Sequence, residues 1–242
     1  MKVTDRWYSD RLGQDISVAR WGSYGAPVLL FPTAGGDAEE VERHHMIAHL
    51  EPLIASGRAK VYSVDSVAGR ALAQHLGSVD DRLALFNAFH ETIAREVIPA
   101  IHSDLGGQQV PVTVAGSSIG AFNALAITCR YPELVHSAVC MSGTYAIERF
   151  LDGRVNDDLY FSSPLRFLPG LGGPVLDVLR TRMVVLASGS GRWEDVGESR
   201  AVAHVLGSKG IPNRVDDWGT AYDHDWPTWW SMLPLYLDDL LP

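Results

Sequence analysis

Short apolar runs alternate with longer amphipathic stretches along the 242-residue chain. Runs rich in Val, Leu and Ala, bounded by Gly, Pro or Asp, predict strands over 15–21, 27–32, 59–65, 110–116, 137–143, 182–189 and 213–219. Apolar residues at three- and four-residue spacing predict helices near 38–56, 82–103, 119–131, 196–208 and 226–240. This alternation predicts an α/β fold with a mostly parallel sheet covered by helices on both faces. The first two strands, joined by a polar turn, are expected to pair as an antiparallel edge hairpin.

One segment, residues 143–178, interrupts the alternation. It is rich in aromatic residues, glycine and proline, and it is too long for a simple connection between a strand and a helix. We interpret it as a short cap-like insertion over the carboxyl edge of the sheet, where open α/β sheets bind ligands. Ordinary helical packing is the alternative. Because the chain has no repeat or linker, residues 1–242 are expected to form a single domain.

Charge and composition exclude several kinds of partner. The formal charge is −9 and no basic run occurs, which argues against nucleic acid and anionic membrane surfaces as partners. No stretch resembles a signal peptide or reaches the ~20 apolar residues of a membrane span. The two cysteines, Cys129 and Cys140, lack metal-ligand spacing and lie in apolar surroundings. A cytoplasmic protein with two buried thiols is the expectation.

The stretch "VTVAGSSIGAFNAL" (112–125) carries the clearest chemical signal. Gly116 to Gly120 match G-x-S-x-G between a predicted strand and a predicted helix, which is the context of a nucleophile elbow. Glycine is needed there because strand and helix approach closely and leave no room for Cβ atoms. The central Ser118 is therefore the predicted nucleophile, and Ser117 is a weaker candidate. The backbone N–H of Ile119, at the start of the helix, is expected to face an oxyanion.

A serine nucleophile needs a base and an acid that orients the base. His224 follows the last predicted strand and is the predicted base, since the chain order Ser, acid, His is that of α/β-hydrolases. The loop after the strand 182–189 offers Glu194, which we favour as the acid, and Asp195 as the alternative. Asp216 and Asp217 on the last strand remain open. Asp223 and Asp225 flank His224 and, as its sequence neighbours, are poorly placed to reach its Nδ1.

The second oxyanion donor is expected in the loop "FPTAGGDAEE" (31–40), where small residues let the backbone turn inward. We assign it to the N–H of Ala34, with Thr33 and Gly35 as alternatives. The loop matches neither glycine-rich phosphate-binding pattern, so no nucleotide cofactor is expected. His45 and His49 share a helix face, but no third metal ligand is evident and no metal is expected.

Several stretches of the chain together resemble the putative esterase family of the α/β-hydrolase superfamily, the group that includes esterase D-like enzymes. The matching pieces run in family order through nearly the whole chain: "LLFPTAGGDAEE", "VYSVDS", "EVIPAI", "AGSSIGAFNAL", "DDLYFSSP", "KGIPNRVDDWG" and "HDWPTWWSMLPLYL". The resemblance implies an α/β-hydrolase fold, Ser118 as nucleophile, His224 as base and cofactor-free hydrolysis of carboxylic esters or thioesters. One departure is the acid loop, which reads G-R-W-E-D where the family pattern leads us to expect G-x-x-D.

The sequence thus predicts a carboxylesterase-type serine hydrolase that acts on a small-molecule ester through a Ser-His-acid triad and an acyl-enzyme. An acyltransferase that uses the same acyl-enzyme is the nearer alternative, because the triad would be identical. A non-catalytic binding module with the hydrolase fold is more distant, since this chain keeps both the serine and the histidine.

Overall fold

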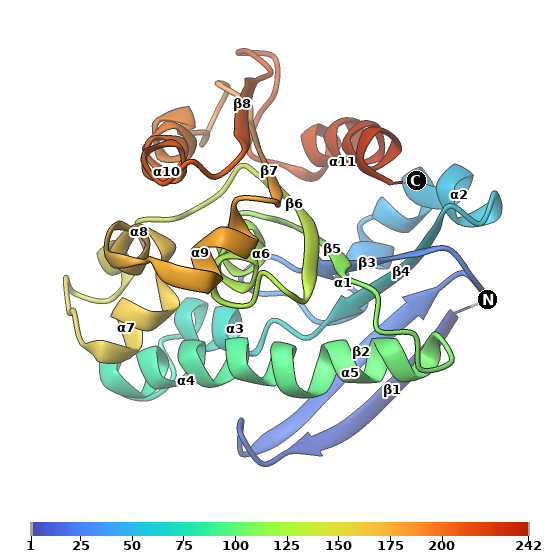
Figure 1. Cartoon of the computed structure of the whole chain (residues 1–242), viewed down its shortest axis with the longest axis horizontal. Helices are drawn as coiled ribbons and strands as arrows, with labels where there is room; N and C mark the ends of the chain where they lie inside the picture. Colours follow the sequence, from blue (N-terminus) through green and yellow to red (C-terminus); the bar gives the residue numbers. More distant parts are fainter. Residues whose placement is uncertain (1, 242) are drawn as a thin grey trace.

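A sheet of eight strands forms the centre of the protein in the computed structural model, which describes residues 2–241 (Figure 1). The strand order is β1-β2-β4-β3-β5-β6-β7-β8. The strands are β1 (Lys2–Ser9), β2 (Gln14–Trp21), β3 (Ala26–Phe31), β4 (Ala59–Val64), β5 (Val112–Ser117), β6 (Val135–Met141), β7 (Met183–Ser188) and β8 (Asn213–Asp217). All pairs from β4 to β8 are parallel, which confirms the predicted α/β fold with a mostly parallel sheet.

The expected pairing at the first edge was wrong. β2 and β3 do not form a hairpin, because β4 lies between them and pairs with β2 antiparallel and with β3 parallel. The edge hairpin consists of β1 and β2 instead, in a register that sets Lys2 opposite Trp21 and Ser9 opposite Gln14. The prediction missed β1, whose sequence KVTDRWYS is mostly polar because much of this edge strand is exposed to solvent.

Helices cover both faces of the sheet. They are α1 (Glu40–Arg43), α2 (Met46–Ala55), α3 (Val67–Ala73), α4 (Val79–Thr92), α5 (Ile98–Asp104), α6 (Ile119–Arg130), α7 (Asp157–Ser162), α8 (Pro164–Phe167), α9 (Gly173–Leu179), α10 (Val196–Ser208) and α11 (Trp226–Leu240). On one face α2 and α11 bury Leu50 and Met232; on the other, α6 and α10 bury Phe122 and Leu206 (Figure 1). Within residues 2–241, no helix combines the length and hydropathy that a bilayer crossing needs.

Two of the long predicted helices are interrupted. The first breaks between α1 and α2, where His45 adopts a left-handed conformation with φ of 63°. The second continues from α4 through a π-helical turn, η1 (Ile93–Val97), into α5. The helix α3 was not predicted. The predicted helices 119–131, 196–208 and 226–240 match α6, α10 and α11 to within one residue.

Residues 143–178 contain η2 (Ile147–Phe150), α7, α8, η3 (Leu168–Gly170) and most of α9. The helix α7 packs on α4, and α8 packs on α6 and α10. The segment starts at the carboxyl end of β6, next to the end of β5. The first residues of the segment are held at this position, because the N–H of Thr144 donates to the carbonyl of Ser118 over 3.2 Å.

Candidate active site

The turn between β5 and α6 has the geometry expected of the elbow. Ser118 adopts φ of 58° and ψ of −122°, a conformation that an L-residue holds only when its surroundings enforce it. A Cβ on Gly116 would overlap the backbone of Gly120, and one on Gly120 would overlap the carbonyl of Phe31. The two glycines therefore let β5, α6 and the end of β3 meet. Ser117 is the last residue of β5 and is buried, whereas Ser118 stands at the turn and is half-buried.

The predicted base and the favoured acid lie together. His224 Nδ1 is 3.6 Å from Glu194 Oε2, and the side chains are 23% and 1% exposed. The backbone joins the two loops as well, because the N–H of His224 donates to the carbonyl of Arg192 over 3.0 Å. Glu194 is thus a buried carboxylate held against a histidine that solvent still reaches.

Two serine hydroxyls also donate hydrogen bonds to the Glu194 carboxylate. Ser142 donates to Oε1 over 2.5 Å, and Ser188 donates to Oε2 over 3.0 Å. Burial raises the pKa of Glu194, but the interactions with His224 and these hydroxyls outweigh it, so the pKa lies below its usual value. Glu194 is therefore ionised at neutral pH and can hold the imidazole in one orientation.

The competing carboxylates are engaged elsewhere. Asp195 caps α10 by accepting the N–H of Gly197 over 2.9 Å, and Asp225 caps α11 by accepting the N–H of Trp226 over 2.7 Å. The remaining three have other partners: Asp216 is paired with Arg214, Asp217 accepts from Ser190, and Asp223 accepts the N–H of Arg192. These contacts favour Glu194 over the alternatives.

Sequence reasoning missed Ser142 and Ser188. Ser142 directly follows β6 with φ of 47°, and its hydroxyl accepts the indole N–H of Trp229 over 2.9 Å. The Trp229 ring meets the His224 ring edge-on, with centroids 5.3 Å apart. Isolated serines carry no spacing signal, so only their positions at the ends of β6 and β7 could have marked them.

The predicted oxyanion residues belong to two adjoining segments. Ile119 is the first residue of α6, and Ala34 lies on the loop after β3. The start of α6 lies close to the end of β3, since a Cβ on Gly120 would overlap the carbonyls of Phe31 and Pro32. A void of about 10 Å³, about the space of one water molecule, is lined in part by Thr33, Ser117 and Trp226.

The histidines of the first helical segment pack against tryptophans. His44 stacks on Trp226 at 4.6 Å and His49 stacks on Trp230 at 4.9 Å between ring centroids. Over residues 2–241, no group of three or more His, Cys, Asp or Glu side chains is arranged to hold a metal ion. Cys129 and Cys140 are free and buried, and burial raises the pKa of both thiols.

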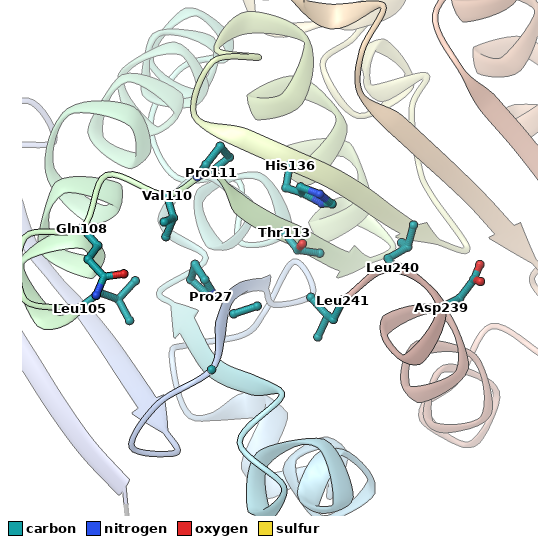
Figure 2. A pocket seen from close by; sticks show the side chains of 12 residues that line it. Pro27, Leu105, Gln108, Val110, Pro111, Thr113, His136, Asp239, Leu240 and Leu241 are labelled. Atoms are coloured by element: carbon teal, nitrogen blue, oxygen red, sulfur yellow. The ribbon is translucent and has the colours of Figure 1, made fainter.

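A much larger cavity, of about 680 Å³, lies at the opposite edge of the sheet. Figure 2 shows it between the starts of the parallel strands, at Pro27, Thr113 and His136, and the end of α11 at Leu241. The carboxyl ends of the same strands carry the elbow and the His224–Glu194 pair. Size alone therefore does not identify the site here, since the chemistry gathers at the other edge.

Comparisons with known proteins identify the family and the fold of the chain. A family model described as "Putative esterase" matches residues 81–235, more than half of the chain, and this range contains Ser118, Glu194 and His224. A comparison with curated proteins finds no match.

Among solved structures, a ferulic acid esterase superposes with a TM-score of 0.76 at 18% identity, over 99% of this chain and 97% of that one. A fluorophosphonate-binding serine hydrolase from Staphylococcus aureus gives 0.74 at 12% identity, over 99% and 98%. An S-formylglutathione hydrolase from Agrobacterium tumefaciens gives 0.69 at 12% identity, over 99% and 92%. At these identities the likeness shows the shared α/β-hydrolase fold. With the family match, it confirms the predicted class: the chain belongs to the "Putative esterase" family and is a carboxylesterase-type enzyme with the α/β-hydrolase fold.

Proposed function

We propose that the protein hydrolyses carboxylic esters or thioesters of small molecules with Ser118, His224 and Glu194 as its catalytic triad. The observation that carries this proposal is the 3.6 Å contact between His224 Nδ1 and the buried Glu194 carboxylate, in loops at the same sheet edge as the strained Ser118 turn. A buried, ionised acid favours the tautomer with a proton on Nδ1 and leaves Nε2 free to accept the serine proton.

The reaction then follows two steps. His224 takes the Ser118 proton as Oγ attacks the carbonyl carbon, and the N–H groups of Ile119 and Ala34 stabilise the oxyanion. Collapse of this intermediate breaks the bond to the leaving alcohol or thiol, which receives the proton from His224. Water, activated by the same imidazole, cleaves the acyl-enzyme and regenerates Ser118. These steps use no metal or cofactor.

The test is hydrolysis of p-nitrophenyl esters from acetate to octanoate by the wild type, Ser118→Ala and Ser117→Ala. Ser117 is the matched control, because it is the adjacent serine and is buried at the end of β5. Loss of turnover in a folded Ser118→Ala protein, with turnover retained in Ser117→Ala, supports the proposal. Equal activity of Ser118→Ala and the wild type overturns it.

The same preparation separates the alternatives. A rise in acyl-enzyme breakdown when an alcohol acceptor is added indicates an acyltransferase. Failure of a fluorophosphonate probe to label the folded wild type indicates a binding module without catalysis, because the probe reports an activated serine.

A further inference from the structure

The loop after β3 is held by a buried carboxylate that the reaction above does not use. Glu40, the first residue of α1, is only 7% exposed. Its Oε2 accepts the backbone N–H of Thr33 over 2.8 Å, and its Oε1 accepts the Thr33 hydroxyl over 2.6 Å. One side chain thus accepts both hydrogen-bond donors of Thr33, the residue that precedes Ala34.

The rest of the loop is shaped around this contact. Gly36 closes a turn by donating its N–H to the Thr33 carbonyl over 3.1 Å, and a Cβ on Gly36 would overlap the Glu40 carboxylate. Arg70 donates to the Gly36 carbonyl over 2.9 Å, and Asp65 accepts the Ala38 N–H over 3.1 Å. Side chains from three different segments therefore hold a loop of small residues in one conformation.

The two oxygens of one side chain hold Thr33, because each accepts a different hydrogen bond from it. The next residue, Ala34, carries the N–H that is assigned to the oxyanion. Donors fixed before the reaction stabilise an oxyanion without reorganisation, so a loop held in one conformation favours the reaction.

We propose that Glu40 is a positioning residue that clamps Thr33 and thereby aims the N–H of Ala34 at the oxyanion. The inference rests on the proposed function, because it takes Ala34 as an oxyanion donor. It also predicts that the geometry of Glu40 matters more than its charge. A glutamine can keep both contacts, with its amide oxygen accepting the Thr33 N–H and its NH₂ group donating to the Thr33 hydroxyl. An alanine loses both.

The experiment compares kcat and KM of Glu40→Ala, Glu40→Gln and the control Glu39→Ala, whose acidic side chain is more exposed and pairs with Lys2. Affinity for a boronic acid is measured in parallel, because it adds to Ser118 and forms an anionic tetrahedral adduct that resembles the transition state. We expect Glu40→Ala to lower kcat by about tenfold or more and to weaken boronate affinity similarly, with KM little changed. Glu40→Gln should stay within about threefold of the wild type in both.

Three results would overturn the proposal that Glu40 positions the loop. The first is equal kcat in Glu40→Ala and Glu39→Ala, and the second is an equal loss of kcat in Glu40→Gln and Glu40→Ala. The third is a rise in the KM of Glu40→Ala with an unchanged kcat. If Glu40→Ala does not fold, Thr33→Val replaces it, because this variant removes only the hydroxyl contact, and Thr33→Ser is its control. Equal kcat in these two variants then rejects the proposal. Failure of the proposed function is recognised separately, by an active Ser118→Ala protein.

Discussion

The indole N–H of Trp229 donates to the hydroxyl of Ser142, which in turn donates to the Glu194 carboxylate. Trp229 and Ser142 are each 3% exposed. Helix α11 is thereby connected to Glu194 through one buried hydroxyl, and the same tryptophan ring packs edge-on against His224. The helix that carries Trp229 therefore supports both of these residues, which we propose as the acid and the base.

Ser142→Ala should lower both stability and turnover. The substitution leaves the buried Trp229 donor without its acceptor, which costs about 1–3 kcal/mol of unfolding free energy. It also removes one of the donors that lower the pKa of Glu194. Urea unfolding and kcat measure the two effects. The control is Ser190→Ala, because the Ser190 hydroxyl contacts Asp217 near the surface. Equal free energies of unfolding in the two variants would show that the Ser142 hydrogen bonds do not stabilise the fold more than this surface contact does.

Glu194→Gln should reduce kcat by about 10³-fold or more while preserving the fold, because a neutral amide neither fixes the tautomer of His224 nor stabilises the imidazolium. Asp195→Asn is the matched control, since asparagine also caps helices well and should keep α10 intact. Kinetics with p-nitrophenyl acetate and circular dichroism decide the matter. Full activity of Glu194→Gln combined with an inactive Asp195→Asn would show that the acid is Asp195.

Stability should fall at acidic pH through His90. This side chain is fully buried, hydrogen-bonded to Asn123 and adjacent to Arg130. Burial lowers the pKa of His90 to about 3. In the unfolded chain the histidine has its ordinary pKa of about 6.5, so between pH 6.5 and pH 3 the unfolded state binds more protons than the folded state. The free energy of unfolding therefore has its full contribution from His90 above pH 6.5 and loses it as the pH falls toward 3. At pH 5 the loss is about 2 kcal/mol.

The variant His90→Gln removes this titration. Urea unfolding at pH 7.5 and pH 5 should show a smaller difference in the variant than in the wild type, whatever its absolute stability. An exposed histidine, His49, provides the control, and His49→Gln should keep the wild-type pH dependence. An unchanged difference in His90→Gln would mean that other groups cause the acid sensitivity.

Trp193 is expected to contact substrate. It immediately precedes Glu194, is 84% exposed and has a left-handed backbone with φ of 67°, so neither packing nor local conformation accounts for a tryptophan there. Trp193→Gly should leave stability equal or raised by up to about 1 kcal/mol, because glycine adopts this conformation freely.

The same variant should lower kcat/KM for longer acyl chains and leave the acetate ester nearly unaffected. The p-nitrophenyl ester series measures this change. Tyr24→Gly is the control, because Tyr24 is also an exposed aromatic residue but is distant from Trp193 in the sequence. A parallel loss on every ester would exclude a role of Trp193 in the recognition of the acyl chain.

The central strands and the elbow were predictable because they depend on residues that are close together in the sequence. Strands buried on both faces appear as continuous apolar runs, and β5 with all its residues buried is the clearest case. The elbow needs glycines at fixed positions around Ser118, so it leaves a motif. Glu194 was favoured from its place after β7, and its contact with His224 now supports that choice.

The missed features depend on contacts between distant segments. The insertion of β4 between β2 and β3 is a matter of strand order, which no local pattern encodes. The contact between Glu40 and Thr33 joins residues only seven apart, but a glutamate in a polar stretch of sequence gives no sign that it will be buried. Ser142 and Ser188 act through hydroxyls, and serines occur in turns of every kind.

The two outer strands have a consequence for how the molecule behaves in concentrated solution. An unpaired sheet edge can recruit the edge of another molecule and start aggregation, and charged side chains oppose this. On β1, Asp5 and Arg6 are paired with Arg20 and Asp15 across the hairpin, and on β8, Arg214 is paired with Asp216. Adding a strand to either edge would strip water from these ions. The charges at both borders thus discourage open-ended growth of the sheet.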